Sequence, residues 1–241
     1  GGVHVKWLGL WLLMSLGGHY ALHLSWWIAI PVSGVLTLVV EAVWNNVFGL
    51  HAPAPSSVGP AERAFVMGNA EARRGRHVEA VAYYDQAALA DARSASLWFN
   101  RGNSLRALGR FGEAVESYDR ALPLYLGDPD AASCWYNRGL ALSADGRFGE
   151  ALESLDKALG IEPEAVDILA DKGAVLARMG NHEEALRTFD AVLEAQPNNA
   201  HIAFNKAKLL GEMGRPDESF EWITRAISMD PKLAETLTRQ K

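Results

Sequence analysis

Polar and hydrophobic residues alternate very differently on the two sides of residue 60. Residues 3–50 are almost continuously apolar, and Lys6 and Glu41 are the only formally charged residues in positions 1–60. The other 181 residues carry 22 basic and 28 acidic side chains between their apolar positions. This pattern predicts lipid as the surroundings of the first part and water as the surroundings of the second. The boundary is the Pro-, Ala- and Ser-rich stretch HAPAPSSVGP, residues 51–60, which predicts an extended linker.

The polar part of the chain repeats itself. GRFGEAVESYDRAL at 109–122 returns as GRFGEALESLDKAL at 146–159. A row of small residues recurs at spacings of 34, 37, 34 and 34: Gly68, Gly102, Gly139, Gly173 and Ala207. Two further rows follow it in each copy, at Gly75, Gly109, Gly146, Gly180 and Gly214 and at Ala80, Ala114, Ala151, Ala185 and Ser219. Such a period predicts a stack of similar units.

Each unit reads as two helices. In the second copy we expect one helix over 97–108 and another over 111–122, separated by Gly109, which can adopt the positive φ of a helix end. Gly102 and Ala114 are small enough for the two helices to approach closely. Because one helix pair cannot cover its own apolar face, the copies are expected to stack on one another.

The third copy resembles the tetratricopeptide repeat, a helix-turn-helix unit of 34 residues. The residues that carry the resemblance are Trp135, Gly139, Leu142, Gly146, Phe148, Ala151, Leu155, Ala158 and Pro163. The resemblance implies an all-α solenoid, a right-handed superhelix of five units over 61–94, 95–131, 132–165, 166–199 and 200–233. The outer units depart from the pattern, with Ala64 and Ala92 in the first and Pro216 in the last. Residues 234–241 are expected to begin a capping helix that continues beyond Lys241.

The family commonly binds peptides in a concave groove lined by the first helix of each unit, which implies a protein or peptide partner here. The residues that the resemblance places in this groove are Asn69, Asn100, Asn103, Arg106, Tyr136, Asn137, Asp171, Arg178, Asn205 and Lys208. An Asn amide both donates and accepts, so it can hold a peptide backbone of any sequence. The alternative is that these Asn side chains serve contacts between units. The carboxylate clamp for chaperone tails is not expected, because Phe65, Ser133 and Asn137 replace its basic residues.

The apolar beginning predicts membrane anchoring over residues 1–50. Trp26–Phe48 has 23 residues with one charge, which is long enough to cross a bilayer. Val3–Leu24 fits a second span, an interfacial helix or a signal sequence. We favour a hairpin with spans over about 4–24 and 26–48. The basic residues at Lys6 and after the second span then place both termini and the repeats in the cytoplasm.

Antiparallel spans would bring Lys6 and Glu41 to similar depths, which predicts an ion pair between them; the alternative is that each side chain extends to the headgroups. His19 and His23, four residues apart, are weak candidates for a metal site without a third ligand nearby.

Composition and motifs narrow the function further. A net charge of −6 gives no basic field for nucleic acid, and Cys134 alone forms no disulfide framework. The chain has no nucleophile elbow, phosphate loop, zinc cluster or dinucleotide fingerprint, so neither an enzyme nor a cofactor is expected. The sequence favours a membrane-anchored scaffold that binds a peptide or protein in its groove. The alternatives are an accessory subunit of a membrane complex and a regulatory arm of an enzyme whose catalytic domain is not in this chain.

Overall fold

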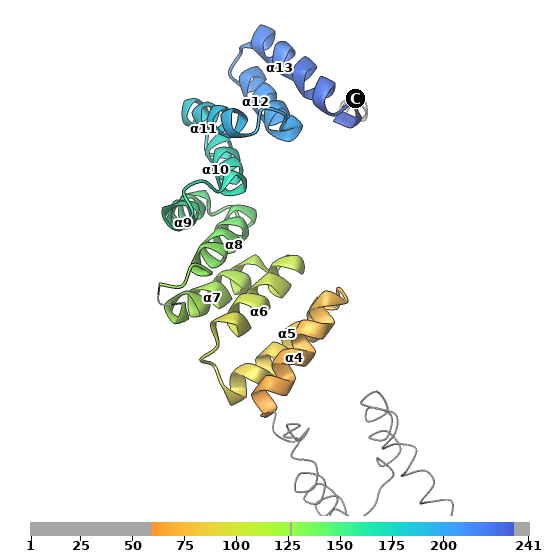
Figure 1. The fold of residues 1–241 in the computed structure, drawn as a ribbon, viewed down its shortest axis with the longest axis vertical. Coiled ribbons are helices and arrows are strands. Elements are labelled where there is room, and N and C mark those ends of the chain that lie inside the picture. Colours follow the sequence, from red (N-terminus) through yellow and green to blue (C-terminus); the bar gives the residue numbers. More distant parts are fainter. Residues whose placement is uncertain (1–58, 126, 234–241) are drawn as a thin grey trace, which may run out of the picture. The chain divides into compact units, whose positions relative to one another are not determined.

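The structure, a computed structural model, describes residues 59–125 and 127–233. These residues form five consecutive pairs of α-helices (Figure 1). The first helices of the pairs are α4 (Pro60–Arg73), α6 (Ala95–Ala107), α8 (Ala131–Ala144), α10 (Val166–Arg178) and α12 (Ala200–Glu212). The second helices are α5 (His77–Ala90), α7 (Phe111–Ala121), α9 (Phe148–Ile161), α11 (His182–Ala195) and α13 (Pro216–Met229). Each helix packs on the next one in the chain, and each first helix also contacts the first helix of the next pair.

The membrane predictions concern residues outside the described part. This applies to the anchoring segment 1–50, to most of the 51–60 linker, to Lys6 and Glu41, and to His19 and His23. The predicted capping helix over 234–241 also lies outside it. Within 59–125 and 127–233, no helix combines the length and the apolar character that a bilayer span requires.

Glycine ends the first helix of every pair, as the sequence predicted. Gly75, Gly109, Gly146, Gly180 and Gly214 all have positive φ, between 73° and 81°. After α6, the amide of Gly109 donates to the carbonyl of Arg106 and the amide of Arg110 donates to that of Leu105. This pair of hydrogen bonds satisfies carbonyls that the helix leaves open and turns the chain back into the next helix.

The predicted limits of α6 and α7 were slightly wrong. Helix α6 begins at Ala95 rather than at Leu97, because the side chain of Ser94 caps it by accepting a hydrogen bond from the Leu97 amide at 3.3 Å. Helix α7 ends at Ala121, and a short 3₁₀ helix, η1 (Leu122–Leu124), follows it. This 3₁₀ turn and the buried side chain of Tyr125 accommodate the longer spacing of the second copy.

Small residues allow the two helices of a pair to approach closely, as expected. A Cβ added at Gly102 would lie 2.6 Å from the Tyr118 ring, and one at Gly68 would lie 2.6 Å from the Tyr84 ring. A Cβ added at Gly173 would likewise lie 2.7 Å from the Phe189 ring. An aromatic ring therefore occupies the space that a side chain on the first helix would need.

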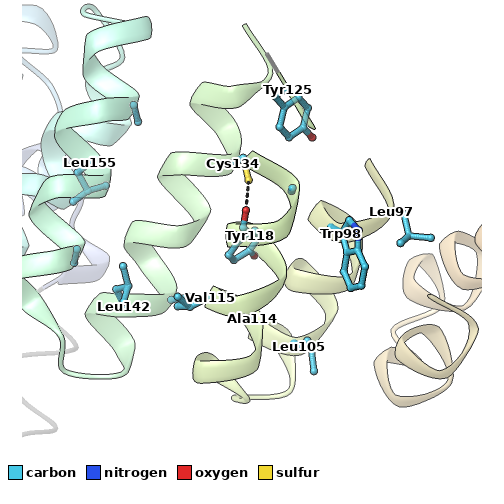
Figure 2. Close-up of a cluster of buried hydrophobic side chains, with 14 of the residues drawn as sticks. Leu97, Trp98, Leu105, Ala114, Val115, Tyr118, Tyr125, Cys134, Leu142 and Leu155 are labelled. Carbon is cyan, nitrogen blue, oxygen red and sulfur yellow. Dashed lines mark hydrogen bonds between the residues drawn. The ribbon is translucent and has the colours of Figure 1, made fainter. Parts of the chain in front are cut away.

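The core continues from one pair to the next. Leu97, Leu105, Tyr118 and Leu142 are almost completely buried, and Figure 2 shows such side chains on successive helices. Leu152 packs against the core of the earlier pairs and against that of the last two pairs. Stacking thus buries the face that a single helix pair would expose, which is the reason that repeats of this kind need neighbours.

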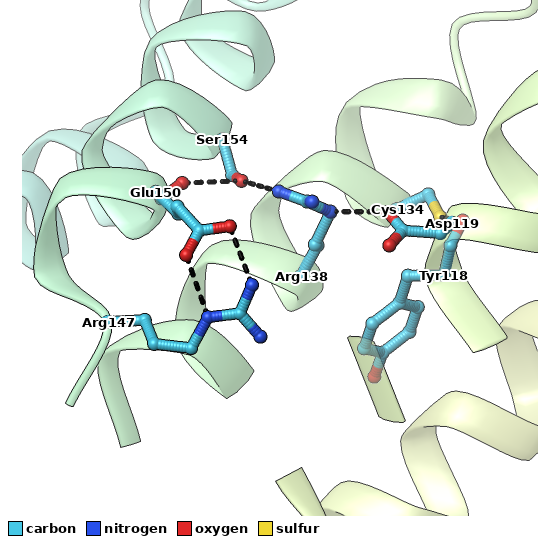
Figure 3. A network of polar contacts seen from close by, with 7 residues as sticks. All are labelled: Tyr118, Asp119, Cys134, Arg138, Arg147, Glu150 and Ser154. Carbon is cyan, nitrogen blue, oxygen red and sulfur yellow. Dashed lines mark hydrogen bonds and ion pairs between the residues drawn. The ribbon is translucent and has the colours of Figure 1, made fainter. Parts of the chain in front are cut away.

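A ladder of ion pairs joins each pair of helices to the next. The basic residue comes from a first helix, and the acidic residue comes from the second helix of the preceding pair. Three rungs have N–O distances of 2.7 Å and the fourth is shorter: Arg101–Asp85, Arg138–Asp119, Lys172–Asp156 and Lys206–Asp190. Arg138 also donates from Nη1 to Ser154 Oγ at 2.7 Å, so it connects three helices (Figure 3). The residues of this ladder recur with the repeat, but their pairing was not predicted from the sequence.

Acidic residues lie at the starts of several second helices. Glu113 and Glu150 are in the first turns of α7 and α9, and Glu183 and Glu184 are in the first turn of α11. Arg147 donates two hydrogen bonds to Glu150, at 2.7 and 2.6 Å (Figure 3). These hydrogen bonds lower the pKa of the Glu150 carboxyl.

Candidate functional site

Contacts between the first helices of neighbouring pairs define a candidate binding surface. We call the surface formed by α4, α6, α8, α10 and α12 the first-helix surface. All ten predicted groove residues lie on these helices. The structure groups some of them into contacts and leaves others apart, so each group is described in turn.

Asn69 and Asn100 are in direct contact. The Asn100 Nδ2 donates to Asn69 Oδ1 at 3.0 Å, and the Tyr84 hydroxyl donates to the same oxygen at 2.8 Å. Within the described residues, the Nδ2 of Asn69 and the Oδ1 of Asn100 have no hydrogen-bond partner. The pair therefore offers one donor and one acceptor, which is what the backbone of an extended peptide requires.

Asn103 repeats half of this arrangement one unit later. The Tyr118 hydroxyl donates to Asn103 Oδ1 at 2.8 Å, which leaves the Asn103 Nδ2 as an unused donor within the described part of the chain. Burial raises the pKa of Tyr84 to about 12, and burial also raises that of Tyr118. Both phenols therefore stay protonated at neutral pH and hold the amides in one orientation.

Arg106, in the last turn of α6, is a cation without an anion. Its Nε is buried and has no hydrogen-bond acceptor, and no carboxylate of the described residues lies within ion-pair distance of its guanidinium. The guanidinium lies against the Tyr118 hydroxyl. Its charge lowers the pKa of Tyr118 and of Tyr136, an effect smaller than that of burial.

Tyr136 and Asp171 form the opposite kind of group. The Tyr136 hydroxyl on α8 donates to Asp171 Oδ2 on α10 at 2.6 Å. Burial raises the pKa of the Asp171 carboxyl, and the negative charge of Asp167, one turn earlier on α10, raises it further. No cation of the described residues pairs with either Asp167 or Asp171. This part of the surface is therefore acidic and only partly hydrated.

A cavity of about 340 Å³ lies beside this acidic group, between α8 and α10. Its lining includes Ser133 and Tyr136 from α8, Asp167 from α10, and Glu162 from the loop that joins α9 to α10. Two of these residues are carboxylates and none is basic. The cavity can therefore accept a positively charged side chain.

The remaining predicted residues do not join these groups. Asn137 donates to the Ser133 carbonyl within α8 at 2.8 Å and makes no hydrogen bond with Asn103. Arg178 donates weakly to the Ser143 carbonyl at 3.3 Å, with its guanidinium 4.5 Å from the centre of the Phe148 ring. Asn205 is exposed, and Lys208 is exposed with its Nζ 3.9 Å from a Glu212 oxygen.

Tyr84, Tyr118 and Asp167 were missed as site residues. Tyr84 and Tyr118 each follow an Asn of the surface by 15 residues, and this shared spacing is the signal that could have found them. The ring of Tyr118 is buried in the core. Only its hydroxyl reaches the surface amide, and sequence alone does not separate the two ends of a side chain.

The chemistry available on this surface is that of binding. Among the described residues, no group of three or more His, Cys, Asp or Glu side chains is arranged to hold a metal ion. Cys134 is buried, and its Sγ lies 3.8 Å from the Tyr118 carbonyl oxygen (Figure 2). Burial raises the pKa of this thiol to about 12, so it is not a reactive thiolate.

The repeated helix pairs and their first-helix surface define a solenoid of the kind that binds other proteins. Three tetratricopeptide repeat models match residues 93–162, 142–209 and 200–233, which together cover 93–233 without a gap. The chain belongs to the tetratricopeptide repeat family. The first pair, α4 and α5, lies outside these matches but has the same glycine turn and the same glycine–tyrosine contact.

Solved structures of similar fold include two named proteins. A crystal structure of MamA is 20% identical, with a TM-score of 0.63, and the match covers 70% of this chain and 97% of that chain. MamA from Desulfovibrio magneticus RS-1 is 18% identical, with a TM-score of 0.66 and coverage of 73% and 98%. YrrB, described as a TPR protein with an unusual peptide-binding site, is 23% identical, with a TM-score of 0.63 and coverage of 75% and 91%. At these identities the likeness shows the fold. A comparison with curated protein sequences found no significant match.

Proposed function

We propose that this protein is a membrane-anchored scaffold whose first-helix surface binds an extended segment of a partner protein. The observation that carries the proposal is the set of unused amide groups on neighbouring units, Asn69, Asn100 and Asn103, held in place by Tyr84 and Tyr118. Fixed amides that both donate and accept match a peptide backbone and cost little ordering when the peptide binds. The peptide-binding site named for YrrB supports the same use of this fold.

The binding role is tested by a pair of variants that remove the same internal hydrogen bond from opposite sides. Asn103→Ala removes the amide, whereas Tyr118→Phe removes only the hydroxyl that orients it. Both should lose stability, by about 1 kcal/mol each. Partner recovery after affinity purification of the full chain from detergent should fall strongly for Asn103→Ala and much less for Tyr118→Phe. Equal recovery from both variants and the wild type would exclude this surface.

Asn137→Ala is the internal comparison. The Nδ2 of Asn137 already donates within α8. We therefore expect Asn137→Ala to reduce partner recovery less than Asn103→Ala does. A larger effect of Asn137→Ala would move the binding surface towards the third unit.

The anchoring part of the proposal rests on residues 1–50. The apolar length of Trp26–Phe48 and the near absence of charge before residue 60 support it. The full chain should remain with membranes after alkaline carbonate extraction, whereas residues 61–241 should not. The scarce basic residues favour the repeats on the cytoplasmic side, which protease protection in sealed vesicles would check.

The same pair of chains separates the scaffold from the accessory-subunit alternative. A partner that residues 61–241 still recover binds the solenoid, as proposed. A partner that is lost together with the first 60 residues binds through the bilayer segment. We propose no catalytic role, because the described side chains supply hydrogen bonds and charges but no activated nucleophile or metal site.

A further inference from the structure

The basic side chains of the solenoid are used in two ways. Arg101, Arg138, Lys172 and Lys206 each have a carboxylate partner in the ladder. Arg110, Arg147 and Arg215 pair with a glutamate three residues later. Arg106 is different, because its side chain is partly buried on the first-helix surface and no carboxylate of the described residues lies within ion-pair distance of it. Other described basic residues without an ion pair, such as Arg73 and Arg187, are exposed, so Arg106 is distinguished by a charge that is both unmatched and partly buried.

The surface around Arg106 adds two unused amide donors and one neutral acceptor, the Oδ1 of Asn100, but no carboxylate of the described residues. The Nδ2 groups of Asn69 and Asn103 donate no hydrogen bond within the described residues. The Oδ1 atoms of the same two amides already accept hydrogen bonds, from the Tyr84 and Tyr118 hydroxyls respectively. Arg73, in the last turn of α4, likewise has no ion-pair partner in the described part. The surface over α4 and α6 is therefore short of anions.

The surface around the first two turns of α10 has the opposite imbalance, whereas Arg178 lies in the last turn of that helix. Asp167 and Asp171 lie one turn apart on α10, and the cavity beside them adds Glu162 without any basic residue. Tyr136 neutralises neither carboxylate, since it only donates a hydrogen bond to Asp171. A half-buried carboxylate next to a second one is unfavourable unless a cation comes close.

We propose that the first-helix surface binds an extended peptide in one direction, with an acidic side chain at Arg106 and a basic side chain in the cavity beside Asp171. This inference rests on the proposed peptide-binding role and names the charge pattern of the partner segment. The acidic group supplies the anion that α4 and α6 lack, and the basic group relieves the repulsion between Asp167 and Asp171. Charges of opposite sign at separate points of a surface also fix the direction in which a peptide lies.

A single extended segment fits better than two separate ligands. Arg106 lies on α6 and Asp171 lies on α10, with α8 between them, and the amides of Asn69, Asn100 and Asn103 lie on the same surface to hold the backbone. Neighbouring helices are about 8–10 Å apart and an extended chain advances about 3.3–3.6 Å per residue, so about five or six residues span the two steps from α6 to α10.

The test uses a set of synthetic dodecapeptides with acetylated and amidated ends, so that only side chains carry charge. Each has one Asp and one Lys in a background of Ala, Ser and Gln, at every separation from two to nine residues and in both orders. Uncharged background peptides complete the set. Binding to the full-length protein in detergent is measured by isothermal titration calorimetry. We expect one order to bind about tenfold more tightly than the reverse order at its best separation.

Four variants assign the charges. Arg106→Gln should weaken the preferred peptide about tenfold and should remove any further effect of changing its Asp to Asn. Asp171→Asn should do the same for its Lys, while Tyr136 still has a side-chain oxygen to which it can donate. Arg187→Gln on α11 and Glu153→Gln on α9 are the controls, because both side chains are exposed on second helices and make no ion pair within the described residues. Neither control should change the affinity.

The outcomes separate this inference from the proposed function. If peptides bind but neither their order nor Arg106 and Asp171 matters, the charge pattern is wrong and the peptide-binding role remains. If the uncharged peptides bind as tightly as the charged ones, the charge pattern is likewise wrong and the peptide-binding role remains. If no peptide of the set binds, both the charge pattern and the binding of short extended segments are overturned.

Discussion

Gly102 shows how a single side chain decides whether a helix pair closes. Its missing Cβ leaves the space that the Tyr118 ring occupies, at 2.6 Å from where that Cβ would lie. Glycine normally weakens a helix, because it loses more backbone entropy than other residues on folding. At this position the close packing of the ring outweighs that cost.

A comparison of two glycines tests this balance. Gly102→Ala should destabilise the protein by about 1–3 kcal/mol, because the ring or the helix must move. Gly112→Ala on the neighbouring helix should stabilise it by up to about 1 kcal/mol, because nothing lies within 4 Å of the added Cβ. Urea unfolding monitored by circular dichroism measures both changes. A stable Gly102→Ala variant would mean that Tyr118 can move without cost.

Asp171 shows the same kind of balance for charge. Burial and the neighbouring Asp167 raise the pKa of its carboxyl above the value in the unfolded chain, although the hydrogen bond that Tyr136 donates to the charged form opposes this increase. In the interval between the unfolded and the folded pKa, the native state binds more protons. Stability therefore falls as the pH rises through this interval, and the full penalty is present above it.

Asp171→Asn should therefore make the protein more stable at pH 7. The gain should shrink as the pH falls and should vanish below about pH 4, where the carboxyl is protonated in the folded and the unfolded chain. Thermal unfolding of the variant and the wild type between pH 3 and 7 checks this. A carboxylate that stabilises the fold would give the opposite sign at neutral pH.

At the scale of helices, the ladder explains how each pair is aligned with the next. The side chain of Arg138 is 16% exposed and donates to Asp119 on α7 and to Ser154 on α9, so one side chain sets the relative position of three helices. Its fork of donors suits this task, because a guanidinium can bind two acceptors at once in a fixed geometry. Partial burial reduces the solvent screening that makes most surface ion pairs weak.

A double-mutant cycle measures the strength of one rung. Asp119→Ala and Arg138→Ala, alone and together, should give a coupling free energy of about 1 kcal/mol. The pair Asp91–Arg93 is the control, since the side chain of Arg93 is 88% exposed and both residues lie in one loop. Its coupling should be near zero. Equal coupling in the two cycles would show that the ladder contributes no more than an ordinary surface pair.

At the scale of the whole solenoid, each described helix pair contacts only the neighbouring pairs within residues 59–125 and 127–233. Stability is then a sum of the pairs and the interfaces between them, and among the described pairs the first and the fifth have one such interface fewer. Leu142 in the third pair and Leu210 in the fifth occupy the same position of the repeat and are equally buried, at 0% and 1% exposure. They form a matched pair for testing this view.

Leu142→Ala and Leu210→Ala each remove about 2–5 kcal/mol of local stability. Leu210→Ala should accelerate amide hydrogen exchange in α12 and α13 while α4–α9 stay protected. Leu142→Ala should accelerate exchange in α8 and α9 and in the pairs on both sides. Hydrogen exchange followed by mass spectrometry distinguishes the two patterns. The same uniform acceleration in both variants would indicate a single cooperative unit.

Periodic features were visible in the sequence because they obey local rules. The spacing of the glycines predicted the helix ends, and the small residues predicted where helices approach, since both depend on the backbone of a few neighbouring residues. The limits of α6 were missed by two residues, because the cap at Ser94 is an individual hydrogen bond rather than a periodic feature.

The contacts between units could not be predicted in the same way. Asn103 and Asn137 were expected to act alike, yet the first is held by Tyr118 and the second bonds within its own helix. Asn137 occupies the position of Asn100 in its unit, and Asn100 donates to Asn69 across the unit boundary. The same position of the repeat therefore has two different acceptors, which the sequence pattern does not distinguish.

The sequence by itself determined the number of helix pairs in the described part, their turns and the family, since each follows from a pattern that recurs along the chain. Only the tertiary structure decided which charges are neutralised and which are left over. The ladder pairs residues 16 or 19 positions apart, and Tyr136 reaches Asp171 across 35 positions. Whether a charge finds a partner depends on distances between helices, and these are set by the packing of side chains rather than by the order of residues.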